Sequence, residues 1–175
     1  LNISRKEVEN KDYGRLLEYF GMMSASIEKL DNTLKEIVDY SKNARVEVKI
    51  EKIELYECLQ ECIEKLSFLE GAKEIKKEII IDGGNIIYCD SDRLNVILIN
   101  IISNAIKYRD INKEEKKLSI TVHSYPYKTS ISIQDNGVGI FSNYVDKVFD
   151  MFYRASDKSN GAGLGLYIVK ETVEK

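Results

Sequence analysis

The longest periodic pattern in the sequence runs from Tyr13 to Tyr40, where apolar residues recur at alternating steps of three and four. This spacing is typical of a heptad repeat and predicts one long helix with an apolar stripe along one side. Such a helix cannot bury its stripe alone in water, so it needs a partner helix from the same chain or from another. The stripe consists of Tyr13, Leu16, Phe20, Met23, Ile27, Leu30, Leu34 and Ile37.

Composition limits what kind of protein this can be. The 175 residues are 43% hydrophobic, which is enough for one core with an appended element. The 26 basic and 29 acidic residues are interspersed and sum to a net charge of -3, so we expect no nucleic-acid partner. No run approaches the roughly 18 to 20 apolar residues of a membrane span, and we expect no direct membrane contact from these residues.

The cysteines and the single histidine indicate the cellular setting. Cys58, Cys62 and Cys89 form no disulfide framework, and His123 is the only histidine, so a zinc site lacks ligands. We therefore expect a reducing, cytoplasmic location. Because the sequence begins with Leu1, we expect a piece of a longer protein, and a membrane segment upstream would make it the cytoplasmic part of a sensor.

The periodicity changes after residue 43, which predicts a boundary between an N-terminal helical part, 1–43, and a second domain, 44–175. The second domain mixes helix and strand signals and carries an Asp90 or Ser91 cap before a long helix. We predict strands at 46–51, 78–82, 86–89, 118–124 and 128–134, and a helix at 55–69.

Two asparagines interrupt the apolar face of the helix that follows Ser91. Asn100 and Asn104 are one turn apart and share a face with Ile97 and Ile101. Two buried amides without partners would be costly, so we expect a ligand or an ion beside them.

Two glycine clusters follow, DNGVGI at 135–140 and NGAGLGLYIVK at 160–170. Glycine at a helix start lets the backbone approach an anion, and the helix dipole attracts its charge. Neither cluster matches the dinucleotide fingerprint or the phosphate-binding loop, and turns alone explain many such glycines.

The order of these motifs carries more information than any one of them. A helix with stacked asparagines, a strand ending in DNGVG, then VFDMFYR and GAGLGL resembles the catalytic ATP-binding domain of sensor histidine kinases, with the Bergerat fold of gyrase-type ATPases. The resemblance extends from about Asp12 to the end of the chain. It implies an α+β fold, a two-layer α/β sandwich with a mixed sheet and helices on one face, preceded by a long bundle helix.

The resemblance also implies roles for individual residues. Asn104 matches the magnesium-binding asparagine, because an amide oxygen is a suitable ligand for Mg²⁺, and Asn100 would lie beside the triphosphate. Asp135 would accept a hydrogen bond from the adenine amino group. The remaining ATP-binding candidates are Lys107 and Tyr108 at the helix end, Gly137 and Gly139 beside the base, Phe149, Phe152 and Arg154 at the lid, and Gly161, Gly163, Leu164 and Gly165 at the phosphates.

In the family, ATP with magnesium donates its terminal phosphoryl group to a histidine on the dimerisation hairpin. The phosphoryl group then passes from this histidine to an aspartate in the receiver domain of a response regulator. The long helix resembles the second hairpin helix, which implies a homodimer in the intact protein. His123 lies in the strand-like LSITVHSY, so we expect the acceptor upstream of Leu1 and no autophosphorylation by this chain. We also expect truncation at the C-terminal end, before the family's closing strands.

Three other interpretations stay open. A gyrase-type ATPase carries a general-base glutamate where this sequence has Asn100, and an anti-sigma-factor kinase does not need the long helix. The third is a degenerate dimerisation scaffold that binds nucleotide weakly and has no kinase activity. A damaged glycine or asparagine motif would favour it.

Overall fold

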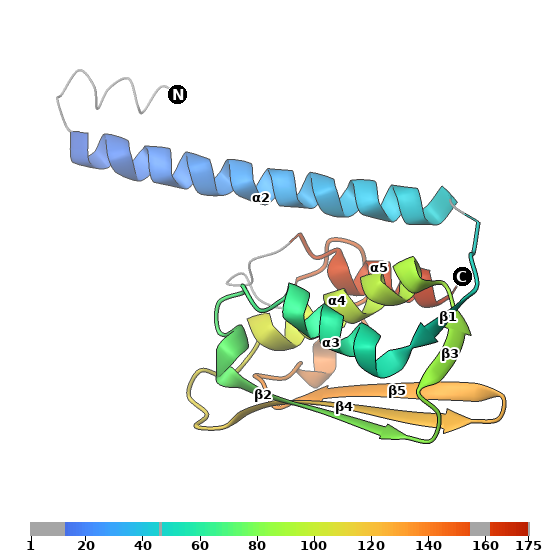
Figure 1. The fold of residues 1–175 in the computed structure, drawn as a ribbon. Helices are drawn as coiled ribbons and strands as arrows, with labels where there is room; N and C mark the ends of the chain where they lie inside the picture. The colour runs from blue at the N-terminus through green and yellow to red at the C-terminus, as the bar shows by residue number, and fades with distance from the viewer. Residues whose placement is uncertain (1–12, 46, 155–161, 175) are drawn as a thin grey trace.

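The computed structural model describes residues 13–45, 47–154 and 162–174, and in it the helices α3, α4 and α5 form one layer over a β-sheet (Figure 1). The long helix α2 lies on the far side of the helical layer from the sheet. The elements are α2 Tyr13–Arg45, β1 Glu51–Glu54, α3 Leu55–Lys65, the 3₁₀ turn η1 Ala72–Glu74, β2 Ile75–Asp82, β3 Ile86–Cys89, α4 Ser91–Lys107, β4 Lys116–Tyr125, β5 Lys128–Asp135, the 3₁₀ turn η2 Ser142–Tyr144 and α5 Gly165–Val173.

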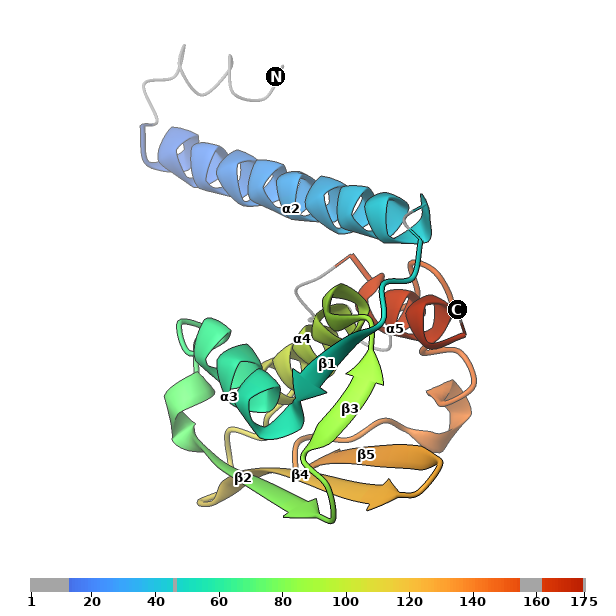
Figure 2. The ribbon, with the colours of Figure 1, turned by 45° about the vertical axis from the view of Figure 1, so that its right-hand side comes forward.

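The main sheet has the order β2-β4-β5 and is mixed. β2 pairs with β4 in parallel, with Ile79 opposite Ile120, and β5 pairs with β4 in antiparallel, with Ile133 opposite Ile120. A separate antiparallel pair, β1 with β3, lies beside the helices (Figure 2). The predicted two-layer sandwich with a mixed sheet and helices on one face is confirmed.

The core lies between the sheet and α3 and α4. Alternate residues of β4 are buried, as expected for a strand with one face on the core. On α4 the buried residues Leu94, Leu98, Ile102 and Ile106 recur every four positions, so one side of the helix faces the core. Full burial of each such side chain contributes about 1.5–3 kcal/mol. The best buried members are Leu55, Leu59, Leu98, Ile102, Ile106, Leu118, Ile120 and Val122.

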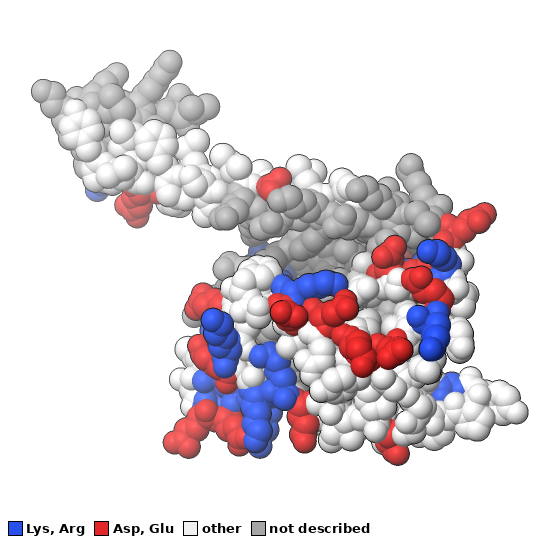
Figure 3. Space-filling model, in the orientation of Figure 1, with Lys and Arg blue, Asp and Glu red and all other residues white. Residues whose placement is uncertain are grey.

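Charged side chains of both signs lie next to one another on the outer surface (Figure 3). Glu115 illustrates this, because its carboxylate lies 3.6 Å from Lys76 Nζ and 2.9 Å from Lys117 Nζ. All three side chains are more than half exposed, and exposed ion pairs contribute at most about 1 kcal/mol. Core burial therefore dominates the stability of the sandwich.

The predicted long helix is present as α2, and its apolar stripe is exposed over most of its length. Leu30 and Leu34 keep 64% and 60% of their surface accessible. Near its C-terminal end, Ile37 meets the sandwich in a small apolar hollow lined also by Met151, Leu164, Tyr167 and Ile168. The rest of the stripe remains available to another helix. No helix in the described part of the chain combines the length and apolar content that a membrane crossing requires.

The strand predicted at 46–51 is wrong for most of its length. Residues 47–50 form no strand, and Val48 and Ile50 are exposed, while Val46 lies outside the described residues. The cause is the bonding of the backbone, because Lys49 N–H donates to Asp90 Oδ2 at the start of α4 instead of to a neighbouring strand. The strand β1 begins only at Glu51, where β3 supplies a partner.

Other boundaries shift by a few residues. The helix predicted to end at residue 69 ends at Lys65, and the strand predicted from residue 78 begins at Ile75, which is buried and pairs with Lys116. The strands at 86–89, 118–124 and 128–134 are confirmed as β3, β4 and β5.

Candidate functional site

The helix α4 carries the predicted asparagines and is fixed at its start by Asp90. The Asp90 carboxylate accepts hydrogen bonds from Arg93 N–H at 3.0 Å and from Lys49 N–H at 2.9 Å. These donors stabilise the charged carboxylate and hold the pKa of Asp90 below its usual range. Of the two predicted caps, Asp90 and Ser91, the N-cap is therefore Asp90, and it anchors the helix at its first turn.

The two asparagines have different surroundings. Asn100 Nδ2 donates to the Val96 carbonyl at 2.8 Å, and a Cβ placed on Gly165 would stand 2.8 Å from Asn100 Oδ1. Asn100 thus supports the close packing of α5 against α4, and its contact with a triphosphate stays a prediction. The half-buried Asn104 side chain forms no hydrogen bond within the described residues, so its amide is available to a ligand.

The loop after β5 is folded tightly around Asp135. Asp135 Oδ1 accepts a hydrogen bond from Gly137 N–H at 2.8 Å, and Val138 N–H donates to the Tyr108 carbonyl at 3.0 Å. A Cβ on Gly137 would lie 2.3 Å from the Tyr108 carbonyl oxygen, which no side chain could tolerate. The glycine is required for the loop to reach the C-terminal end of α4, where Lys107 and Tyr108 are exposed.

The two ends of the predicted lid lie against each other. Gly163 has φ +75°, and a Cβ on it would stand 2.6 Å from the Tyr153 carbonyl oxygen and 2.8 Å from the Phe152 carbonyl carbon. Phe152 itself has a left-handed φ of 63°, which is uncommon for a bulky residue. The structure therefore brings the residues on either side of 155–161 together, and this segment with Gly161 lies outside the described residues.

The aromatic side chains at the lid are partly accessible. Phe149 and Phe152 keep 40% and 55% of their surface exposed, and the Tyr144 and Tyr153 rings pack 6.2 Å apart. Leu164, in contrast, is almost fully buried at 2%. Leu164 therefore fixes the start of α5 in the core, while the two phenylalanines remain able to contact other groups. Arg154, where the predicted lid begins, is the last described residue before 155–161.

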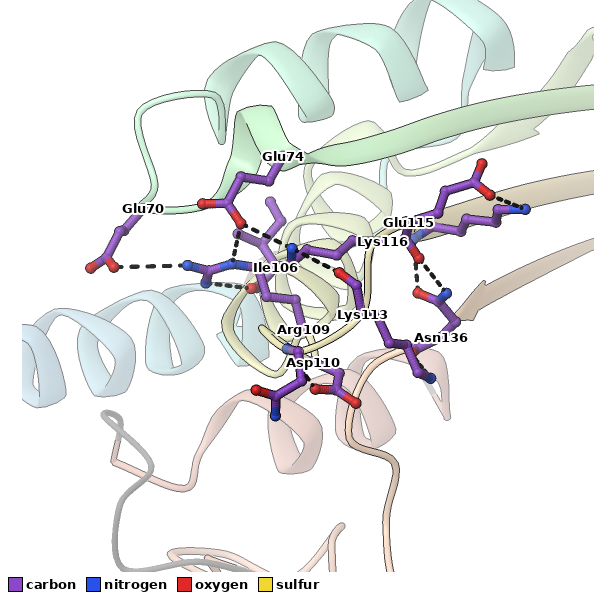
Figure 4. Close-up of polar contacts among 11 residues, drawn as sticks. Glu70, Glu74, Ile106, Arg109, Asp110, Lys113, Glu115, Lys116 and Asn136 are labelled. Carbon is purple, nitrogen blue, oxygen red and sulfur yellow. Dashed lines mark hydrogen bonds and ion pairs between the residues drawn. The ribbon is translucent and has the colours of Figure 1, made fainter.

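Sequence reasoning missed Arg109. The Arg109 guanidinium lies directly over Gly71, and a Cβ added to Gly71 would stand 1.9 Å from Arg109 Cζ. Arg109 Nη1 also donates a hydrogen bond to the Ile106 carbonyl at 3.2 Å. Glu70 and Glu74 approach the same guanidinium at 3.8 and 3.6 Å (Figure 4). These contacts tie the end of α4 to η1. No sequence signal marked them, because Gly71 and Arg109 are far apart in the chain.

Asn136 was also missed, although it lies between two predicted site residues. Its side-chain oxygen accepts from Lys117 N–H at 2.8 Å, and its Nδ2 donates to the Glu115 carbonyl at 2.9 Å. Lys113 Nζ donates to the Asn136 carbonyl at 2.5 Å (Figure 4). The loop after β5 is thus bonded to the segment that precedes β4.

The sandwich, with Asn104 on α4, Asp135 at the end of β5 and Gly163 just before α5, is that of a histidine kinase-type ATP-binding domain. Residues 89–175 match the family pattern of histidine kinase-, DNA gyrase B- and HSP90-like ATPases. Asn104, Asp135 and the glycines all fall within this segment, whereas Gly71 and η1 precede it.

Relatives with curated names agree with this assignment. The chain is 42% identical over 91 residues to the sensor protein kinase WalK of Staphylococcus aureus, an alignment that covers 49% of this chain and 21% of the relative. WalK of Staphylococcus aureus strain Newman is also 42% identical over 91 residues, and this alignment covers 49% of this chain and 14% of the relative. The chain therefore spans only about a fifth or less of these relatives.

Solved structures share the fold. The histidine kinase AdeS of Acinetobacter baumannii matches 99% of this chain with a TM-score of 0.69 at 20% identity, over 82% of its own length. A mycobacterial sensor histidine kinase, MprB, matches 72% of this chain with a TM-score of 0.59 at 23% identity, over 79% of its length. The likeness to AdeS includes the long helix as well as the sandwich.

Proposed function

We propose that this chain is the ATP-binding catalytic part of a two-component sensor histidine kinase that uses ATP with Mg²⁺. One observation carries the proposal: the hydrogen bond from Val138 N–H to the Tyr108 carbonyl joins the end of the helix that carries Asn104 to the loop that follows Asp135. The Asn104 side chain forms no hydrogen bond within the described residues. Asn104 and Asp135 both lie in the segment that matches the ATPase family.

Asp135 is suited to select adenine. Its Oδ1 is already oriented by the Gly137 N–H, and the residue is exposed, so the carboxylate can accept a further hydrogen bond from an exocyclic amino group. The partly exposed Tyr108 side chain, at the adjoining end of α4, offers an aromatic surface for the base or ribose.

Asn104 is suited to hold Mg²⁺, because the ion prefers hard oxygen ligands and this amide oxygen has no competing donor in the described chain. When bound, the ion would offset the charge of the phosphates. Lys107 follows Asn104 by about one helical turn, and its side chain is exposed. It would approach the same phosphates. The N-terminus of α5, which begins at Gly165, would direct backbone N–H groups toward them.

We propose that the phosphoryl acceptor is a histidine outside these 175 residues, and that a response-regulator receiver domain takes the group next. His123, the single histidine, lies on β4 with its Nδ1 3.1 Å from Asp82 Oδ2 on β2. His123 therefore lies in the sheet, whereas the proposed acceptor histidine would lie on a bundle helix. The exposed stripe of α2 would join a second copy of the protein in a homodimer.

The test is a calorimetric titration of the purified chain with ATP and with a non-hydrolysable analogue, each with and without Mg²⁺. The proposal predicts binding of both, strengthened by Mg²⁺, and weaker binding of GTP because its base offers a carbonyl where adenine offers an amino group. Absence of binding up to millimolar ATP by a sample that melts cooperatively would contradict the proposal and favour the scaffold interpretation.

A further inference from the structure

We propose that Asn136 is a positioning residue that fixes the Asp135 carboxylate for adenine recognition. The inference rests on the proposed ATP-binding function and adds to it a residue outside the predicted site. Asn136 stands between Asp135, which would contact the base, and Gly137, which must approach the Tyr108 carbonyl.

Every polar group of Asn136 has a partner within the chain. Its backbone N–H donates to the Lys117 carbonyl at 3.2 Å, and its carbonyl accepts from Lys113 Nζ at 2.5 Å. Its side-chain oxygen accepts from Lys117 N–H at 2.8 Å, and its Nδ2 donates to the Glu115 carbonyl at 2.9 Å. An amide offers both a donor and an acceptor, so the side chain takes the place of a further strand residue.

These side-chain bonds begin where the sheet ends. The last pair of the β4–β5 ladder joins Leu118 to Asp135, so the strands themselves are already paired without the Asn136 side chain. Beyond this pair the chain turns toward α4. At this turn the side-chain amide of Asn136 is hydrogen-bonded to the backbone of Glu115 and Lys117. The side chain therefore restrains the loop and not the sheet.

The restraint acts directly on Asp135. With Asn136 held to the start of β4 and Val138 N–H held to the Tyr108 carbonyl, the intervening Gly137 N–H is fixed, and that group donates to Asp135 Oδ1. The carboxylate is thus oriented by a backbone group that is anchored on both sides. Loss of either anchor would let the carboxylate sample other positions, which weakens a directional hydrogen bond more than general packing.

The test compares Asn136→Ala with the unchanged chain in titrations with Mg-ATP and Mg-GTP. Removal of two hydrogen bonds is expected to weaken ATP binding about tenfold and GTP binding far less, so that the preference for ATP falls. A variant that merely loosens the fold would weaken both nucleotides equally. Equal weakening, or an unchanged preference for ATP, would overturn the inference.

A milder pair of variants covers the case in which Asn136→Ala does not fold. Lys113→Ala removes only the exposed side chain that bonds the Asn136 carbonyl, and Lys117→Ala removes an equal charge that pairs with Glu115 instead. We expect the preference for ATP to fall about threefold in Lys113→Ala and to stay unchanged in Lys117→Ala. Equal effects of the two variants would contradict the inference. Failure of the unchanged chain to bind ATP would instead refute the proposed function, and the inference with it.

Discussion

The Tyr108 carbonyl at the end of α4 accepts a hydrogen bond from Val138 N–H in the loop after β5, at 3.0 Å. This hydrogen bond joins the end of the helix that carries Asn104 to the loop that follows Asp135, and β4 and β5 separate the two in the chain. Gly137 makes the approach possible, because any side chain there would strike the same carbonyl.

Asp135→Ala is expected to weaken ATP binding by roughly 10- to 100-fold, because a hydrogen bond to a charged group contributes about 1.5–3 kcal/mol. Calorimetric titration measures the change. Asp92→Ala, which removes an exposed carboxylate in the first turn of α4, serves as the control and should leave the affinity unchanged. Similar losses in both variants would show that the effect comes from net charge.

Asn104→Ala is expected to abolish the strengthening of ATP binding by Mg²⁺ while leaving metal-free binding nearly intact. The reason is that only the proposed metal ligand is removed. Asn104→Asp keeps an oxygen ligand and should retain the Mg²⁺ effect. The ratio of the dissociation constants without and with Mg²⁺ is the quantity to compare, and an unchanged ratio in Asn104→Ala would refute the assignment.

Gly163→Ala is expected to lower the melting temperature more than Gly139→Ala does. Both glycines have left-handed φ values, +75° and +72°, which cost about 1–2 kcal/mol for another residue. A Cβ at Gly163 also meets the Tyr153 carbonyl at 2.6 Å, whereas nothing lies within 4 Å of one at Gly139. Thermal unfolding monitored by circular dichroism distinguishes the two, and equal shifts would argue against the close contact.

Asp90→Ala is expected to lower the free energy of unfolding by about 1 kcal/mol at neutral pH, the usual cost of losing an N-cap. Because the folded-state pKa of Asp90 is lowered, its contribution is complete above the ordinary value of about 3.9 and is lost as pH falls through the folded-state value. Urea unfolding of both proteins across this range should show the difference shrinking only at acidic pH. A constant difference would contradict the role of the charge.

Incubation of the chain with labelled ATP is expected to give no stable phosphohistidine. His123 is held on β4 beside Asp82 and has no place on a helix of the kind that carries the acceptor in the proposed reaction. Acid-labile, alkali-stable label on the protein would contradict this prediction, and loss of that label in His123→Gln would identify the site.

The sequence predicted those elements whose signals are local. The heptad stripe predicted α2, a cap at Asp90 or Ser91 predicted the start of α4, and alternating residues predicted the β4–β5 hairpin. Val48 and Ile50 alternate with charged residues as in a strand, but the backbone of Lys49 bonds to Asp90 instead. Local alternation could not reveal that a side chain distant in the sequence would compete for the backbone.

The site shows the same division. Helical spacing predicted a ligand beside Asn100 and Asn104, the glycine clusters predicted close backbone approach, and the family resemblance predicted the role of Asp135. None of these signals could show that Asn100 packs on Gly165, that Arg109 lies over Gly71, or that Asn136 bonds to the start of β4. Each of these contacts joins elements distant in the sequence, and each gives a polar residue a partner that only the folded chain supplies.

The most direct test of the account is a crystal structure of the chain with a non-hydrolysable ATP analogue and Mg²⁺. The account predicts the adenine amino group within hydrogen-bonding distance of the Asp135 carboxylate and the metal ion coordinated by the Asn104 side-chain oxygen. Nucleotide bound elsewhere on the chain, or bound here with Asn104 and Asp135 both uninvolved, would contradict it.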